Sequence, residues 1–195
     1  STITQSGVNI SSDTSFQFLK PRVDIRFTPV TTDLLRFKIE RTVSQLNFSN
    51  FVPRYNVRDD RFTAGNPDLR PETAWQYEFG YEHRLGNDQG VLRARIFYND
   101  IQDRIESVAL DLDGDGDFDT ASGNIGDATE YGGEIGFSLR MTSIGLPNLL
   151  LDGSYLRRWS SVIDPFTGIE RKMATNADYE ATLSIRHDVA DWNFS

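Results

Sequence analysis

The sequence contains no cysteine and only two histidines, His83 and His187. Without cysteine, disulfide scaffolds, thiolate zinc sites and cysteine nucleophiles are excluded. With two histidines, few side chains are available as metal ligands or general bases near neutral pH. No Gly-x-Ser-x-Gly, His-Glu-x-x-His or phosphate-binding glycine loop occurs either. We therefore expect that this chain is not an enzyme.

Basic residues are also scarce, because 20 Lys and Arg stand against 29 Asp and Glu, a formal net charge of −9. This balance argues against a nucleic-acid partner bound through its phosphates. No stretch approaches the roughly 18 apolar residues of a transmembrane helix. The N-terminus lacks the charged and apolar regions of a signal peptide, which is either missing or was removed.

Aromatic residues make up 12% of the chain, and many of them recur at every second position. Between Thr73 and Leu85, aromatic and apolar residues occupy one parity, while Gln, Glu, Gly and Arg occupy the other. A period of two indicates a strand, since a helix would scatter these residues around its circumference. Clear alternation recurs at 91–98, 130–141 and 178–189, and noisier strands are expected near 15–28, 34–48 and 149–160. The sequence predicts about seven strands and no helix.

Short and long connections alternate between these strands. Short turns are predicted at 28–33, 86–90, 143–148 and 190–193, and long polar connections near 49–72, 111–127 and 161–176. This alternation predicts an antiparallel up-and-down sheet with tight turns at one end of the strands and long loops at the other. Transmembrane β-barrels have that asymmetry, but soluble sandwiches vary their loops as well, so both architectures stay open on periodicity alone.

The polar parity of the strands carries arginines among glutamates. Mixed charge suits a barrel lumen, where opposite charges pair across strands, and it equally suits a solvated sheet face. Glu78 and Glu82 share this parity, but four strand residues separate them by about 13 Å, too far for a glycosidase pair. We interpret them as lumen-facing charges.

An acidic segment carries the clearest chemical pattern, with Gly116 at position six of a calcium-loop spacing. The acidic residues at positions one, three, five and nine are Asp111, Asp113, Asp115 and Asp119. Position twelve is Ser122 rather than the bidentate glutamate, and no flanking helices are predicted. These aspartates are therefore predicted either to bind Ca²⁺ and stiffen an extracellular loop or to form a hydrated acidic loop.

The octet Gly65-Asn66-Pro67-Asp68-Leu69-Arg70-Pro71-Glu72 reads as a loop, because its prolines and its Gly-Asn pair interrupt regular structure. Together with the strand that follows it, the octet resembles the barrel of TonB-dependent outer-membrane receptors. Three further stretches resemble barrel strands of that family, at 41–48, 96–105 and 131–135. The resemblance covers roughly residues 15–190.

The resemblance implies an all-β fold, an antiparallel up-and-down meander of about seven strands that forms part of a transmembrane β-barrel of about 22 strands. Residues 1–195 are then expected to be a partial barrel domain, with the plug domain and the closing strands absent. About seven strands cannot close such a barrel, so the isolated chain is expected to self-associate through its strand edges and not to transport by itself.

The resemblance also implies a function for the intact protein in the outer membrane of a Gram-negative cell. There it would take up a scarce nutrient, such as siderophore-bound iron, a cobalamin or an oligosaccharide. Expected partners are membrane lipid, that nutrient, and an inner-membrane energy-coupling complex contacted through the missing N-terminal part. Aromatic side chains would form girdles at the membrane interfaces: Trp75, Tyr81, Tyr98, Tyr155, Trp159 and Tyr179.

The alternative interpretation is a soluble, calcium-dependent β-sandwich module that binds carbohydrate. In a sandwich the apolar parity and its aromatic residues are buried against a second sheet. In a barrel the same parity contacts lipid. The two hypotheses therefore differ in what covers one face of the sheet.

Overall fold

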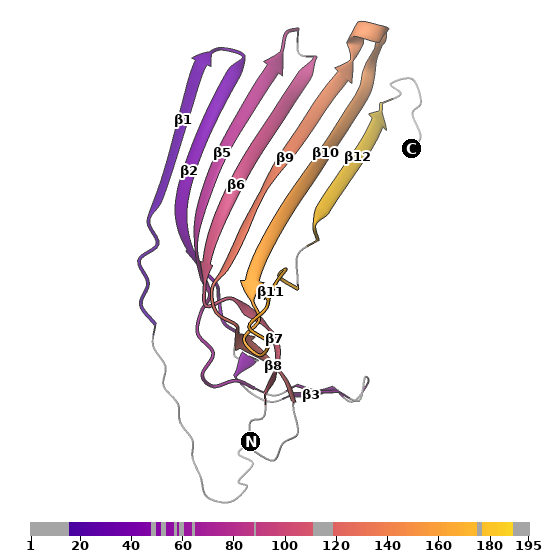
Figure 1. Cartoon of the computed structure of the whole chain (residues 1–195). Coiled ribbons are helices and arrows are strands. Elements are labelled where there is room, and N and C mark those ends of the chain that lie inside the picture. Colours follow the sequence, from indigo (N-terminus) through magenta and orange to yellow (C-terminus); the bar gives the residue numbers. More distant parts are fainter. Residues whose placement is uncertain are drawn as a thin grey trace, which may run out of the picture.

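The computed structural model describes residues 16–47, 50–51, 54–56, 58, 61–63, 65–87, 89–110, 119–174 and 177–188. Seven long strands follow one another in a single curved antiparallel sheet (Figure 1). They are β1 (Arg22–Val30), β2 (Asp33–Val43), β5 (Thr73–Leu85), β6 (Gly90–Gln102), β9 (Ala128–Met141), β10 (Leu146–Ile163) and β12 (Tyr179–His187). The predicted all-β meander of about seven strands is confirmed.

Smaller elements lie in the connections. Two hairpins form from β3 (Arg54–Asn56) with β4 (Arg61–Thr63) and from β7 (Ile105–Leu110) with β8 (Asp119–Asn124), and β11 (Glu170–Arg171) pairs with the end of β10. A 3₁₀ turn, η2 (Thr142–Ile144), lies between β9 and β10. Within the described part, no helix has the length and apolar character needed to cross a membrane.

Strand β1 differs from its predicted bounds. It begins at Arg22 and continues through Pro29 to Val30, where a turn was expected. Proline lacks the N–H that a central strand donates, but among the described residues β1 has a single neighbour in this sheet, β2. The pairing of β1 with β2 is also irregular between Phe27 and Val30, which accommodates the proline.

The short connections lie at one end of the sheet and the long ones at the other (Figure 1). Two tight turns use left-handed backbone conformations, at Asn87 with φ 56° and at Gly145 with φ 82°. Asparagine and glycine adopt this conformation more readily than other residues. We call the two ends of the sheet the turn end and the loop end.

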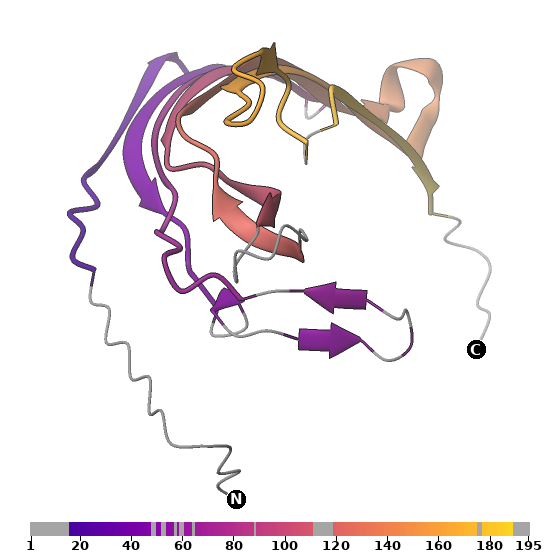
Figure 2. The same cartoon turned by 60° about the horizontal axis from the view of Figure 1, so that its bottom comes forward.

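The sheet arches, and the hairpins of the long connections lie beneath the arch, on its concave side (Figure 2). Strand pairing aligns the parities of neighbouring strands, so that Phe79 of β5 lies between Phe37 of β2 and Ile96 of β6. Aromatic and aliphatic side chains therefore share the convex face. Charged side chains share the concave face.

The buried core lies at the loop end rather than along the sheet. There the concave parity changes from charged to apolar, and Ile125 and Met173 from the connections cover it. The strand residues that they cover are Ala74, Ile101, Ala128 and Val162. The long connections are therefore packed onto the concave side of the sheet. Val108 of β7 also packs against this core.

Candidate functional site

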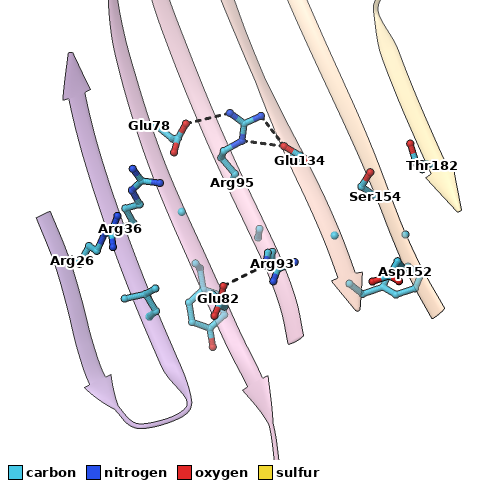
Figure 3. Close-up of a pocket in the computed structure, with 17 residues that line it drawn as sticks. Arg26, Arg36, Glu78, Glu82, Arg93, Arg95, Glu134, Asp152, Ser154 and Thr182 are labelled. Carbon is cyan, nitrogen blue, oxygen red and sulfur yellow. Dashed lines mark hydrogen bonds and ion pairs between the residues drawn. The ribbon is translucent and has the colours of Figure 1, made fainter. Parts of the chain in front are cut away.

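The concave face is crossed by ion pairs that link neighbouring strands (Figure 3). Arg95 of β6 lies between two carboxylates, with its Nη1 3.2 Å from Glu78 Oε2 and its Nη2 2.7 Å from Glu134 Oε2. Nearer the turn end, Arg93 Nε lies 3.3 Å from Glu82 Oε2. The structure thus places Glu78 and Glu82 on the concave face, each paired with an arginine from the next strand.

This pairing pattern continues to the edge of the sheet. Arg36 of β2 donates to both oxygens of Asp24 on β1, with Nη2 2.5 Å from Oδ2. A hollow of about 470 Å³ lies along the concave face between these pairs and the polar side chains of β10 and β12. Asp152, Ser154 and Thr182 line its far side (Figure 3). Such a surface is polar, carries both charges and suits contact with water or polar ligands.

The convex face carries an aromatic row formed by strand register. Tyr77, Tyr98, Tyr131 and Trp159 are direct partners across β5, β6, β9 and β10. Ring centroids are 6.2 Å apart for Tyr77 and Tyr98, and 5.6 Å apart for Tyr131 and Trp159. Near the end of this row, the Arg157 guanidinium lies 5.2 Å from the Trp159 ring centroid. Such a row is what a membrane interface favours.

The six aromatic residues predicted as girdle members all lie on the convex parity. Tyr98 and Trp159 belong to the row itself, and Tyr81 and Tyr155 lie four residues nearer the turn end on β5 and β10. Trp75 lies nearer the loop end of β5, and Tyr179 of β12 is the strand partner of Arg157. The prediction omitted Tyr77 and Tyr131, although both follow the same alternation. Their membership of a girdle stays a prediction.

The two histidines lie apart on the sheet. His83 is near the turn end of β5, and its Nδ1 lies 2.6 Å from Asp33 Oδ1, which also accepts the Tyr81 hydroxyl at 2.7 Å. His187 ends β12. The His83 cluster is a cross-strand contact at the sheet margin, between Asp33 of β2 and its strand partner on β5.

The octet forms a clamp between two connections. Asn124 of β8 accepts from Arg70 N at 2.8 Å and donates to Arg70 O at 2.9 Å, although 54 residues separate them. Asn66 Nδ2 donates to Ser122 O at 2.9 Å. Leu69 is buried at the centre, with 1% of its surface exposed. The sequence identifies the octet as a loop, but it does not reveal its partner because the contact is long-range.

The acidic segment cannot be placed in the same way. Asp111, Asp113 and Asp115 lie outside the described residues, and the side chain of Asp119 at the start of β8 is not described. Leu110 and Asp119 are strand partners, so the segment joins the two strands of a hairpin. In the part of the chain that the structure describes, no three His, Asp or Glu residues form a metal-binding group. Calcium binding stays a prediction.

A second turn at the loop end is held by Asp164. Its Oδ1 accepts the backbone N–H of Phe166 and of Thr167, each at 3.0 Å, and its Oδ2 lies 3.0 Å from Arg171 Nε. The Arg171 guanidinium and these N–H groups lower the pKa of the Asp164 carboxyl to about 2. The same Arg171 side chain also forms an ion pair with Glu106 on β7.

Comparison with known proteins places this geometry in a family. The sequence model described as TonB dependent receptor-like, beta-barrel matches residues 2–195. No curated protein matches the sequence of the chain.

Solved structures share the fold at low sequence identity. The siderophore receptor PirA from Pseudomonas aeruginosa is 18% identical, with a TM-score of 0.59 over 74% of this chain and 28% of that one. The copper transporter OprC is 20% identical, with a TM-score of 0.61 over 88% and 24%. A mutant ferric enterobactin receptor, PfeA from Pseudomonas aeruginosa, in complex with enterobactin, is 18% identical, with a TM-score of 0.60 over 88% and 26%.

The chain therefore spans about a quarter of the length of these structures. Receptors of this family are outer-membrane proteins that carry ligands rather than catalyse reactions. The family match over almost the whole sequence agrees with the meander, its charged concave face and its apolar convex face. This chain belongs to the TonB-dependent receptor-like β-barrel family.

Proposed function

We propose that the chain forms part of the barrel wall of an outer-membrane receptor that imports a scarce nutrient with energy delivered through TonB. The observation that carries this proposal is a single-layered sheet with two unlike faces. On the convex face, Ile96 and Ile135 are each 62% exposed and Leu183 is 68% exposed. On the concave face, arginines and carboxylates pair across strands.

An exposed aliphatic face of this extent needs lipid or another apolar cover. In the soluble sandwich considered above, a second sheet covers that face. Among the described residues no second sheet lies against it, and both hairpins lie on the concave side (Figure 2). The calcium-dependent carbohydrate-binding module is therefore not favoured.

In the proposed mechanism, the parts of the chain have separate roles. The convex face contacts lipid, the concave face lines the lumen, and the connections at the loop end form part of the mouth that captures the nutrient. The chain covers about a quarter of its structural neighbours, so the complete receptor, with its plug and its energy-coupling complex, performs the import. A ferric siderophore is the first candidate nutrient, because two of the neighbours above are siderophore receptors.

The test is an uptake panel in Gram-negative cells that express the complete receptor and lack their own receptors for the same nutrients. The probes are a radio-iron-labelled ferric catecholate, labelled cyanocobalamin and a labelled maltooligosaccharide. We expect accumulation of one probe, and we expect a protonophore or loss of the energy-coupling complex to abolish it. Uptake that persists without the proton gradient would contradict TonB coupling. Absence of uptake for every probe would contradict the nutrient classes proposed.

A further inference from the structure

Glu106, at the start of β7, is a buried carboxylate with 2% of its side chain exposed. It lies at the loop end, away from the ion pairs that line the concave face. A carboxylate is seldom buried without charged or N–H partners, because removing it from water costs several kcal/mol otherwise. The groups that contact the Glu106 carboxylate therefore show which parts of the chain this residue joins.

Those partners come from two different connections. Arg171 Nη1 lies 3.0 Å from Glu106 Oε2, and the backbone N–H of Ala174 donates to Oε1 at 2.9 Å. Arg104, which precedes β7, places its Nε 3.6 Å from Oε1. Glu106 thus joins the connection 103–127 to the connection 164–178, across 65 to 68 residues of sequence.

The two arginines that contact Glu106 each form a further ion pair with another carboxylate. Arg104 Nη1 lies 3.1 Å from Glu72 Oε2, and the same oxygen accepts the N–H of Ile105 at 3.0 Å. At the other end Arg171 Nε contacts Asp164. The charges alternate in sign along this chain of five residues: Glu72, Arg104, Glu106, Arg171 and Asp164. All three long connections contribute to it.

Three members of this chain are shielded from water, with side-chain exposure of 2% for Glu106, 15% for Arg104 and 19% for Glu72. Arg171 is 35% exposed, still less than the 58% of Arg93 among the ion pairs on the concave face. The apolar residues Met173, Ile125 and Val162 are buried at the same end. Ion pairs in such surroundings are screened less than exposed ones. Separating one connection from the others would leave charges unpaired in a poorly hydrated site, which is strongly unfavourable.

We propose that Glu106 is a positioning residue that locks the three connections into one preformed wall of the nutrient-binding mouth. This inference rests on the proposed function, because the mouth is defined by nutrient capture. A wall that is ordered before the nutrient arrives spares the ordering cost at binding. Removing the lock should therefore weaken capture more than it slows transport of nutrient already bound.

The experiment uses the complete receptor in liposomes with spin labels at two exposed positions, Ser107 in β7 and Phe166 in the 164–178 connection. Because this chain has no cysteine, the substitutions S107C and F166C label only these sites once any cysteines elsewhere in the receptor are replaced. Pulsed electron–electron resonance then gives the distribution of distances between β7 and the 164–178 connection. We expect one narrow distribution in the parent and a broad one after Glu106→Gln or Arg171→Met.

The paired variant makes the test specific. If Glu106 and Arg171 act on each other, E106Q/R171M should broaden the distribution no more than the larger single change, since the second change leaves no additional charge unpaired. Glu106→Asp keeps the charge and should restore part of the narrow distribution. Arg186→Met is the control, because the Arg186–Asp188 pair has the same 3.0 Å separation but lies exposed at the turn end. It should leave the distribution unchanged.

Uptake of the radio-iron-labelled ferric catecholate provides the second readout. We expect E106Q to raise the concentration for half-maximal uptake by about tenfold, with the maximal rate changed by less than about twofold, as loss of preorganisation predicts. Unchanged distances together with unchanged half-maximal concentration in E106Q and R171M would overturn the inference. If E106Q does not reach the membrane, R171M decides, since Arg171 is the more exposed partner. Broadened distances in a receptor that imports no probe would overturn the proposed function and still support the lock.

Discussion

Adjacent glycines in β9 differ in how much space surrounds them. A Cβ added at Gly132 would overlap the carbonyl oxygen of Arg157 and lie 2.8 Å from the Phe97 ring. A Cβ added at Gly133 would lie 3.5 Å from the nearest atom, the carbonyl oxygen of Arg95. The Tyr-Gly-Gly-Glu sequence indicates a strand, but it does not distinguish the two positions because the neighbours come from β6 and β10.

We predict that Gly132→Ala destabilises the barrel and that Gly133→Ala does not. Overlap with backbone cannot be relieved by a side-chain rotation, so the cost should be about 1–3 kcal/mol. Urea unfolding of the complete receptor in detergent, followed by the electrophoretic shift of folded barrels, measures the difference. Equal midpoints for the two variants would show that the strands around Gly132 move apart readily.

Asp164 gives a prediction for pH. Its pKa is lowered to about 2, below an ordinary value of about 3.9. A lowered pKa in the folded state contributes stability above the unfolded-state value, and this contribution is lost as the pH falls from about 4 to about 2. Carboxyl chemical shifts of Asp164 by NMR should therefore titrate near 2 in the folded receptor. In Arg171→Met the titration should move up toward the ordinary value, whereas Arg186→Met should leave it in place.

At the scale of the element, β6 shows what alternation alone can predict. Its parity assigned Ile96 and Tyr98 to one face and Arg95 to the other, and the structure agrees. Alternation could not show that Ile101 is buried on the concave side, because its burial depends on Met173 and Ile125 arriving from other connections. A strand sequence specifies its two faces, and the partners specify what covers them.

We predict that labels along β6 alternate in environment with a period of two. Single cysteines at 94, 96 and 98 should give spin labels accessible to oxygen, which concentrates in lipid. Spin labels on cysteines at 93, 95 and 97 should instead be more accessible to a water-soluble nickel complex, because the concave face lines an aqueous lumen. Accessibility is measured by power-saturation electron resonance with the complete receptor in liposomes. Equal accessibility at all six positions would contradict the lipid-facing assignment of the convex parity.

The hairpin of β7 and β8 allows a test of the acidic segment. If Asp111, Asp113, Asp115 and Asp119 bind Ca²⁺, the ion should hold the ends of the hairpin together. Calcium should then slow hydrogen exchange of the β7 and β8 amides, and Asp113→Asn should abolish this effect. Asp188→Asn, at the exposed end of β12, is the control and should keep it. Exchange that calcium leaves unchanged in the parent receptor would favour the hydrated acidic loop.

At the scale of the whole molecule, the described residues form a sheet with one uncovered apolar face and two open edges. Among these residues, β1 pairs with β2 alone, and β12 pairs with β10 alone. Open edges present unpaired N–H and C=O groups, and they pair readily with another chain. The isolated chain therefore contains two features that favour association, and both are satisfied when neighbouring strands and lipid surround it.

We predict that the isolated chain associates in water and that detergent reverses the association. Sedimentation velocity at several protein concentrations, with and without detergent, measures this directly. The sedimentation coefficient should rise with concentration in buffer alone and become constant in detergent. A compact monomer in buffer would contradict the lipid-facing assignment, because it would require the apolar face to be covered by the chain itself.

The sequence by itself determined the seven long strands, their faces and the alternation of short and long connections, because these depend on residues that are neighbours along the chain. It did not predict the short strands of the hairpins β3–β4 and β7–β8, which lie within the long connections. The bounds of β5 follow directly from the alternation between Thr73 and Leu85. The octet and its flanking strands were also sufficient to indicate the family. Local patterns carry this information because a strand places every second side chain on the same face.

Only the tertiary structure decided which distant residues meet. Asn124 holds Arg70 across 54 residues, and Glu106 binds Arg171 across 65. Neither pair has a local signature, since a buried carboxylate and an exposed one have the same sequence context. The core at the loop end was undetermined for the same reason: Ala74 and Val162 become buried only when the connections fold over the concave face. Contacts of this kind depend on chain topology and on the exclusion of water, which no single stretch of sequence specifies.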